Sequence, residues 1–263
     1  MKTLYIDTCV LPRCRLEEAE YYDRHLGKEV GFELLPMFDL DAFEANLNEN
    51  LSLFSKRPLI FHEPVWGVEH SAPKGSDEYS KSMYHVMLTK KAADALHPSD
   101  MVFHLNNCRV QEDRRQQMLE TALENLEEMR QLFSGVRILV ENTGTAAVGD
   151  CLLDQEAFTR LCLERNLDVL IDVGHANANS WDILRLTEDL KANIRGYHLH
   201  NNDGFHDQHH RLREGTIDFP KLLPILDERT PDAFWVIEYT DPALHGMPVL
   251  EDARLALSCR KQA

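Results

Sequence analysis

The sequence has no long apolar run. A helix that crosses a membrane needs about 18 or more consecutive, mostly apolar residues, and no stretch of this chain approaches that length. The opening residues, MKTLYIDTCVLPRC, carry Asp7 and Arg13 and lack the unbroken apolar segment of a secretory signal peptide. We therefore expect neither a membrane span nor secretion.

Closely spaced cysteine pairs are also absent. None of the six cysteines belongs to a C-x-x-C pair, and their positions are scattered: Cys9, Cys14, Cys108, Cys151, Cys162 and Cys259. A zinc ribbon needs such pairs, so that kind of site is excluded. Scattered cysteines without a secretion signal predict a reduced, cytoplasmic protein.

Cations are few in comparison with anions. The chain has 28 lysines and arginines against 44 aspartates and glutamates, which gives a formal net charge of −16. Because such a charge repels a phosphate backbone, we do not expect nucleic acid among the partners.

Low-complexity tracts, repeats and Gly/Ser-rich linkers are missing too, so residues 1–263 are predicted to form a single domain. The longest polar interruption, VWGVEHSAPKGSDEYS at residues 65–80, predicts a long loop. Either Trp66 and His70 in this loop form a lid over a functional site, or the loop is an ordinary surface excursion.

The sequence does contain a regular alternation of two kinds of segment. Eight short apolar runs lie at residues 4–7, 32–37, 59–62, 101–104, 138–141, 169–172, 196–198 and 235–238. Segments with helical spacing and charged faces lie around them, at residues 15–26, 40–54, 81–95, 111–133, 153–164, 181–190, 219–226 and 248–257. Apolar strands that alternate with helices indicate parallel strands buried on both faces. The pattern predicts an α/β fold, a single (β/α)8 TIM barrel, with an open doubly wound sheet as the alternative.

Ionisable residues stand at the ends of six successive runs, in LIFHEP, MVFHLNN, ILVENTG, VLIDVGHAN, RGYHLHNNDG and WVIEYTD. They are His62, His104, Glu141, Asp172 with His175, His198 with Asp207 and His209 in the loop that follows, and Glu238. Such a group beside a buried strand is costly unless it is paired or bound to metal. Barrel strands end at one mouth, so we expect a metal site there. Imidazoles and carboxylates without thiolates favour zinc, manganese, cobalt or iron.

Two kinds of chemistry fit these ligand types. A central carboxylate such as Glu141 can bridge two ions that hold the attacking and leaving oxygens of a displacement. A single ion held by Glu141, Asp172, His198 and Glu238 would instead bind neighbouring oxygens of a hydroxy-carbonyl compound, while a carboxylate moves a proton.

The motifs ENTG, IDVGHAN and HLHNNDGFHDQHHRLREGTIDF resemble the xylose-isomerase-like TIM-barrel superfamily, and the resemblance covers about residues 32–239. That superfamily contains sugar (phosphate) isomerases and epimerases and the endonuclease IV type of AP endonuclease family 2. For the isomerase branch, the resemblance implies one divalent metal on Glu141, Asp172, His198 and Glu238. It also implies that Glu141 and Glu238 are the acid/base pair and that His175 helps to hold substrate oxygens.

For the endonuclease IV branch, the resemblance implies three zinc ions on the same residues together with His62, His104, His175, Asp207 and His209. We therefore expect one to three ions of zinc, manganese or cobalt. The remaining histidines of the motif, His200, His206 and His210, are expected to touch ligands or substrate, or to be solvated.

Several positions depart from the DNA-repair branch. The second strand ends in the acidic ELLPMFDLD, Val65 stands where that branch has an aromatic residue, and Arg213 replaces a glycine. The chain follows the isomerase-type pattern HLHDNDG…D.H…GEG.IDF closely, with Asn201 in place of the aspartate.

We therefore expect a metal-dependent isomerase or epimerase of a small sugar, sugar phosphate or polyol. The alternatives are a multinuclear zinc hydrolase of a phosphoester and a non-catalytic metal-binding barrel. The expected partner is a small carbohydrate-like molecule, with no membrane and no nucleic acid, and a homo-oligomer is left open.

Two further residues are candidate substrate contacts. Glu33, in GFELL, resembles a glutamate near the end of the second strand in sugar-binding relatives, or is a barrel carboxylate bonded to backbone. Arg211 would hold a phosphate or carboxylate with its planar fork, or form a surface ion pair.

Overall fold

Eight parallel strands form a closed barrel in the computed structural model, which describes residues 3–13, 15–27 and 30–260. Each strand pairs with the next along the chain, and β1 closes the barrel against β8. The strands are β1 (Leu4–Asp7), β2 (Val30–Leu34), β3 (Leu59–Phe61), β4 (Asp100–Phe103), β5 (Arg137–Glu141), β6 (Val169–Asp172), β7 (Ile194–Leu199) and β8 (Phe234–Ile237). The predicted TIM barrel is confirmed, and the open sheet is wrong.

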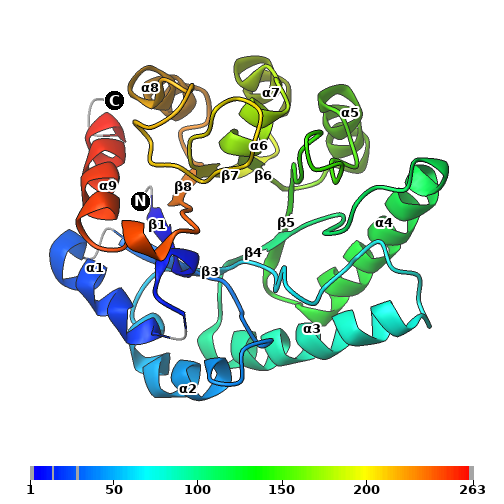
Figure 1. The fold of residues 1–263 in the computed structure, drawn as a ribbon, viewed down its shortest axis with the longest axis horizontal. Helices are drawn as coiled ribbons and strands as arrows, with labels where there is room; N and C mark the ends of the chain where they lie inside the picture. Colours follow the sequence, from blue (N-terminus) through cyan, green and yellow to red (C-terminus); the bar gives the residue numbers. More distant parts are fainter. Residues whose placement is uncertain (1–2, 14, 28–29, 261–263) are drawn as a thin grey trace.

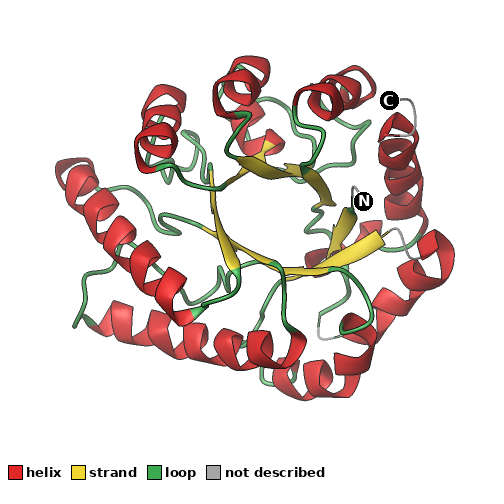
Figure 2. Cartoon of the chain, turned by 180° about the vertical axis from the view of Figure 1, so that it is seen from behind, coloured by secondary structure: helices red, strands yellow, loops and turns green. Residues whose placement is uncertain are grey.

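Helices form a ring outside the barrel (Figures 1 and 2). They are α1 (Ala19–Leu26), α2 (Phe43–Phe54), α3 (Asp77–Leu96), α4 (Arg115–Leu132), α5 (Gln155–Arg165), α7 (Ile183–Leu190), α8 (Phe219–Arg229) and α9 (Met247–Arg260). Short 3-10 turns are η1 (Thr8–Val10), η2 (Leu16–Glu18), η4 (Glu112–Arg114) and η5 (Pro242–Leu244). Among the described residues, no helix is both long and apolar enough to cross a membrane.

Two local features differ from the expected pattern. A short helix, α6 (Val173–Ala178), begins directly after β6, and the Asp172 carboxylate caps it by accepting the His175 backbone N–H. The predicted loop at 65–80 ends at Ser76, because Ser76 caps α3 and accepts the Tyr79 N–H at 3.1 Å. Residues 77–80 therefore form the first turn of α3.

The barrel interior contains an apolar layer, here called the floor. Its members are Tyr5, Ile60, Val102, Leu139, Leu170, Phe234 and Val236. Strands β2 and β7 have glycine at this level. A Cβ on Gly31 would lie 2.7 Å from the Tyr5 ring, and one on Gly196 would lie 2.2 Å from the Phe234 ring, so neither position has room for a side chain. The aromatic rings therefore fill the space that side chains from β2 and β7 would occupy.

Side chains alternate along a strand, so the residue two positions after each inward residue also points inward. On all eight strands, the residue two positions after the last residue at floor level is ionisable. These residues form what we call the polar ring: Asp7, Glu33, His62, His104, Glu141, Asp172, His198 and Glu238. Seven of them are buried, and the Glu238 side chain is 12% exposed. The fold thus places eight titratable groups at one end of the barrel.

Candidate metal centre

The nine predicted ligands lie together at the carboxyl ends of the strands. They are His62, His104, Glu141, Asp172, His175, His198, Asp207, His209 and Glu238. Seven come from strand ends or from α6, and the loop after β7 supplies the other two. Residues separated by more than 170 positions in the sequence therefore meet at one site.

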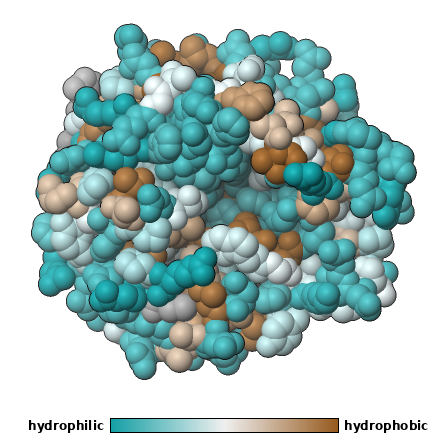
Figure 3. All heavy atoms as spheres, in the orientation of Figure 1, coloured by the Kyte–Doolittle hydropathy of each residue, from teal (hydrophilic) through white to brown (hydrophobic). Residues whose placement is uncertain are grey.

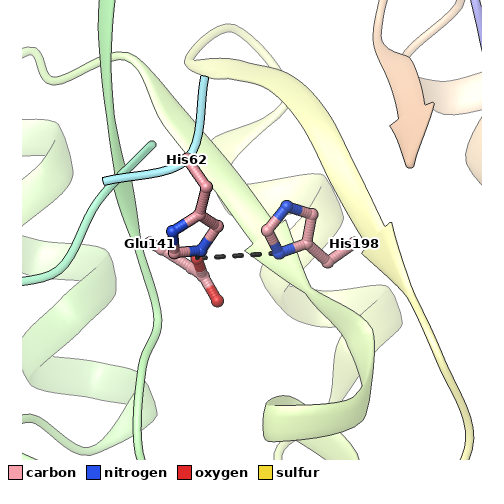
Figure 4. Close-up of side chains that lie close together, drawn as sticks. All are labelled: His62, Glu141 and His198. Carbon is pink, nitrogen blue, oxygen red and sulfur yellow. Dashed lines mark ion pairs between the residues drawn. The ribbon is translucent and has the colours of Figure 1, made fainter. Parts of the chain in front are cut away.

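Glu141, at the end of β5, occupies the centre of this cluster. Its Oε2 lies 3.0 Å from His104 Nε2, 3.8 Å from His62 Nε2 and 3.6 Å from His198 Nδ1. Its Oε1 lies 3.2 Å from His175 Nδ1. Figure 4 shows His62 and His198 approaching the Glu141 carboxylate from different strands. A carboxylate with imidazoles around both oxygens is suited to bridge two ions.

Asp172, His198 and Glu238 form an inner ligand set, in which one ligand atom of each lies within 4.8 Å of the others. His198 Nδ1 is 3.2 Å from Glu238 Oε2 and 3.7 Å from Asp172 Oδ2. On its other side, His198 Nε2 pairs with Glu33 Oε2 at 3.0 Å. Asn142 fixes the backbone of Asp172 through hydrogen bonds of 2.8 and 2.9 Å. The set offers oxygen and imidazole ligands, which suit a divalent cation.

His175, Asp207 and His209 form an outer ligand set. Asp207 Oδ2 is 3.3 Å from His175 Nε2 and 3.2 Å from His209 Nε2. Two of these residues lie in the loop after β7, which is closed by an antiparallel backbone pair between Asn201 and His210, with both N···O distances 2.8 Å. This pairing turns the loop back so that it meets α6 and the strand ends.

Several imidazoles are oriented as metal ligands are. His62 Nδ1 donates to the Glu63 carbonyl at 2.8 Å, and His209 Nδ1 donates to a backbone carbonyl at 3.1 Å. His104 Nδ1 bonds to the Asn107 side-chain oxygen at 2.7 Å. Because those oxygens only accept, each Nδ1 carries a proton, and Nε2 is the nitrogen that faces the cluster and that a metal would bind.

Some buried polar atoms of the cluster have no hydrogen-bond partner among the described residues. They are His175 Nδ1, His198 Nδ1 and Glu238 Oε2. A buried polar atom without a partner is costly. His198 and Glu238 belong to one candidate ligand group with Asp172, and His175 belongs to another with Glu141 and Asp172, so divalent cations in these groups would satisfy the three atoms and the residues fit a metal.

Burial and mutual charge shift the pKa values in opposite directions. Burial alone would lower the pKa of His104, but the Glu141 carboxylate outweighs it and raises the pKa to about 9. For His209, burial would again lower the pKa, but Glu238, Asp207 and Asp172 together outweigh it and raise the pKa to about 9. Burial would raise the pKa of Glu141, but the charges of His104 and His198 hold it well below its usual range. Protons and a cation would therefore compete for the same lone pairs.

Asp7 belongs to the polar ring but was not predicted as a site residue. Its side chain is buried at the end of β1, beside Glu33 and Glu238. Burial, together with the charges of these two carboxylates, raises the pKa of Asp7 well above its usual range. The signal was present in the sequence, because Asp7 directly follows the apolar run LYI just as the other ring members follow theirs.

Glu63 and Asn107 support the cluster from outside, and the sequence analysis missed both. Glu63 Oε1 accepts from Asn107 Nδ2 at 2.8 Å, and Glu63 Oε2 is 2.9 Å from His70 Nε2. Burial would raise the pKa of Glu63, but His70 lowers it to about 2. Since Asn107 also bonds His104, the segment at 65–76 that contains His70 is tied to a predicted ligand.

The two predicted substrate contacts outside the ligand sets lie in different surroundings. Glu33 faces the cluster, where it pairs with His198. The Arg211 guanidinium is engaged by α9 instead: Nε donates to Asp252 Oδ2 and Nη2 to Glu251 Oε2, both at 2.9 Å. The structure therefore brings Glu33 to the site and directs Arg211 to a pair of helix carboxylates.

A cavity of about 260 Å³ lies among the loops that follow β1, β2, β3 and β8. Its lining includes Cys9, Leu11, Arg13, Met37, Trp66 and Thr240. Cys9 is close enough to Asp7, Glu33 and Glu238 for their charges to act on its thiol. The cavity thus adjoins the polar ring, and the face in Figure 3 is hollowed near its centre.

The chain matches the family model described as a xylose isomerase-like TIM barrel over residues 29–260, and it belongs to that family. Members of this superfamily are enzymes, among them isomerases, epimerases and endonuclease IV. An uncharacterized protein of Methanocaldococcus jannaschii is 33% identical over 76 residues, which cover 28% of this chain. That stretch spans about a quarter (26%) of the relative.

Solved structures share the fold over the whole chain. A D-tagatose 3-epimerase-like protein has a TM-score of 0.79 at 18% identity, covering 100% of this chain and 98% of its own. An IolI protein solved with a zinc atom has a TM-score of 0.74 at 15% identity, covering 100% and 97%. Endonuclease IV from Thermus thermophilus has a TM-score of 0.68 at 18% identity, covering 99% and 100%. At these identities the likeness concerns the fold alone.

Proposed function

We propose that this protein is a divalent-metal-dependent isomerase or epimerase of a small sugar, sugar phosphate or polyol. The observation that carries the proposal is the approach of two carboxylates, Glu141 and Glu238, to the same atom, His198 Nδ1, at 3.6 and 3.2 Å. Asp172 Oδ2 lies 3.7 Å from the same nitrogen, so three carboxylates meet at His198, which supports a single catalytic ion.

Several side chains would have different roles in the reaction. When bound, a divalent ion supplies Lewis-acid polarisation of a carbonyl oxygen. Glu238, whose Oε2 has no hydrogen-bond partner among the described residues, takes the proton from the carbon next to that carbonyl. Glu141 passes on a proton that it takes from the protonated His104, whose Nε2 lies 3.0 Å away. The proton goes to the opposite face of the same carbon, which inverts it, or to the neighbouring carbon, which isomerises the substrate, and the proton held by Glu238 is released to solvent. His175 holds a substrate oxygen beside Glu141.

A zinc-dependent phosphoester hydrolase is the second candidate, and a specific observation favours it. The outer set of His175, Asp207 and His209 is complete, and His62 and His104 flank Glu141. Those residues are more than one ion needs. The net charge of −16 still opposes a DNA substrate.

Metal stoichiometry separates the two candidates. We would measure it by elemental analysis on untagged protein purified without chelator. About one ion per chain supports the isomerase, and about three zinc ions per chain support the hydrolase.

Solvent exchange provides the matching activity test. Candidate ketose–aldose and epimer pairs would be incubated with the protein in D2O and followed by NMR. The proposal expects deuterium at the carbon next to the carbonyl with wild type and none with Glu238→Gln. Release of phosphate or alcohol from a phosphoester without such exchange would contradict it.

Four expectations stay predictions. They are the cytoplasmic location, the identity of the metal, a homo-oligomeric state and a lid formed by the segment after β3. The described cysteines, Cys9, Cys108, Cys151, Cys162 and Cys259, are free thiols, as the first of these requires.

A further inference from the structure

His200 lies inside the cluster, two residues after His198, and its side chain is fully buried. Its Nε2 is 3.0 Å from Asp172 Oδ2. One face of the ring stacks on His209, with centroids 3.8 Å apart. Close to the ring is Gly174 in α6, where a Cβ would lie 2.0 Å from His200 Cε1. These contacts therefore hold the imidazole ring in one position.

The other ring nitrogen shows which role Nε2 plays. In His62, His104 and His209, Nδ1 is bonded to a protein acceptor, which frees Nε2 for a metal. His200 Nδ1 is buried and has no hydrogen-bond partner among the described residues. If Nε2 bound an ion, the proton would sit on Nδ1 as a buried N–H without an acceptor. The favoured tautomer therefore carries its proton on Nε2, facing Asp172.

Every other hydrogen-bonding part of Asp172 is already fixed by neighbours. Its Oδ1 accepts the His175 backbone N–H, and Asn142 bonds both its backbone N–H and its carbonyl. The remaining oxygen, Oδ2, faces the inner ligand set, and it accepts a hydrogen bond from His200 Nε2. A carboxylate ligand held in this way keeps its orientation before the metal arrives.

We infer that His200 is a positioning residue that donates its Nε2–H to Asp172 and thereby orients this carboxylate for the metal. The inference rests on the proposed metal site and adds a residue to it. The alternative is a direct ligand, since His200 also lies within 4.8 Å of ligand atoms of His209 and Glu238. The experiment must separate a donor from a ligand.

The test is a Co²⁺ titration of the whole chain after chelator treatment, followed by visible absorption and by elemental analysis. We expect His200→Ala to weaken Co²⁺ binding about 10–100-fold with the number of ions unchanged. His200→Gln should recover most of the loss, because its amide N–H reaches the same acceptor. Rescue by an amide donor is expected for positioning, and a structural role for the ring would not produce it.

Gly174→Ala tests the same hydrogen bond without altering any imidazole. The added Cβ would displace the His200 ring, so Co²⁺ binding should weaken as in His200→Ala. Alanine is the better helix former, so destabilised helix α6 would not explain the loss. His206→Ala is the matched control, because the His206 side chain is 59% exposed and its ion pair is with the exposed Asp203.

Two results would overturn the inference. One ion fewer in both His200→Ala and His200→Gln, with an altered cobalt spectrum, would make His200 a ligand. Unchanged affinity in both His200→Ala and Gly174→Ala would remove its role altogether while leaving the metal site in place. A wild-type chain that binds no Co²⁺ would instead refute the proposed function itself. If His200→Ala fails to fold, His200→Gln and Gly174→Ala decide.

Discussion

The apolar floor and the polar ring belong to the same barrel, and the strands contribute to both through inward positions two residues apart. Leu139 and Glu141 on β5 show the contrast, since both are essentially inaccessible to solvent. Burying Leu139 is favourable by roughly 1.5–3 kcal/mol. Burying the Glu141 carboxylate is costly unless imidazoles or a cation compensate.

This difference separates stability from function along a single strand. The floor members are hydrophobic and pack against one another, so they stabilise the barrel whatever it catalyses. The ring collects eight titratable groups, most with the pKa shifts that charged neighbours cause. A substitution should therefore have different consequences according to its layer.

The largest expected effect is that of Glu141→Gln in the ring. The change keeps the volume and removes the charge, so the barrel should stay folded. Turnover should fall about 10²–10⁴-fold, the usual contribution of a general acid or base, with bound metal lost as well. Elemental analysis, thermal melting and the D2O assay would check this, with the exposed Glu156→Gln as the control. Full metal and full activity in Glu141→Gln would refute the assignment of the site.

Leu139→Ala in the floor should show the opposite pattern. The residue is fully buried, and its truncation should reduce the free energy of unfolding by about 2–5 kcal/mol. Metal content at a temperature where the variant is folded should match wild type. Denaturant unfolding and elemental analysis are the measurements. Loss of metal from a folded Leu139→Ala would show that the two layers are not independent.

The smallest expected effect, that of pH, concerns His209 in the loop beside the ring. The carboxylates around His209 outweigh its burial and raise its pKa to about 9, so this imidazole holds its proton at neutral pH when no metal is bound. A cation must displace that proton, so affinity should rise with pH between 7 and 9. The slope should be up to about tenfold per pH unit for each imidazole bound. Zn²⁺ competition against a chelator at several pH values would measure it, and a flat profile would contradict it.

The sequence predicted the fold well, because the evidence for it is local. Each strand is a short apolar run, and each long helix repeats its apolar residues at helical spacing. Helix α6 was missed because its six residues are too few to show a period. The end of β2 was placed too late, since the apolar residues that continue past Leu34 belong to the following loop.

The strand-end rule predicted most of the site, and its limits are physical. It applied to Asp7 equally but was not used there. The roles of Asn107 and Glu63 could not be predicted, because they depend on how two loops fold against each other. The ion pair of Arg211 with α9 joins residues 41 positions apart, which no local pattern shows. The placement of His200 beside Gly174 likewise depends on tertiary packing.

The edge-to-face contact of Tyr5 and Phe234 also affects the route by which ions, water and substrate reach the site. Their ring centroids are 5.2 Å apart at an angle of 74°, and Gly31 and Gly196 allow the rings to fill the barrel below the polar ring. This apolar layer closes the barrel below the polar ring, so we expect ions, water and substrate to enter among the loops at the carboxyl ends of the strands. The residence time of a bound ion is then set by those loops, and extraction by a chelator measures their motion as well as the affinity.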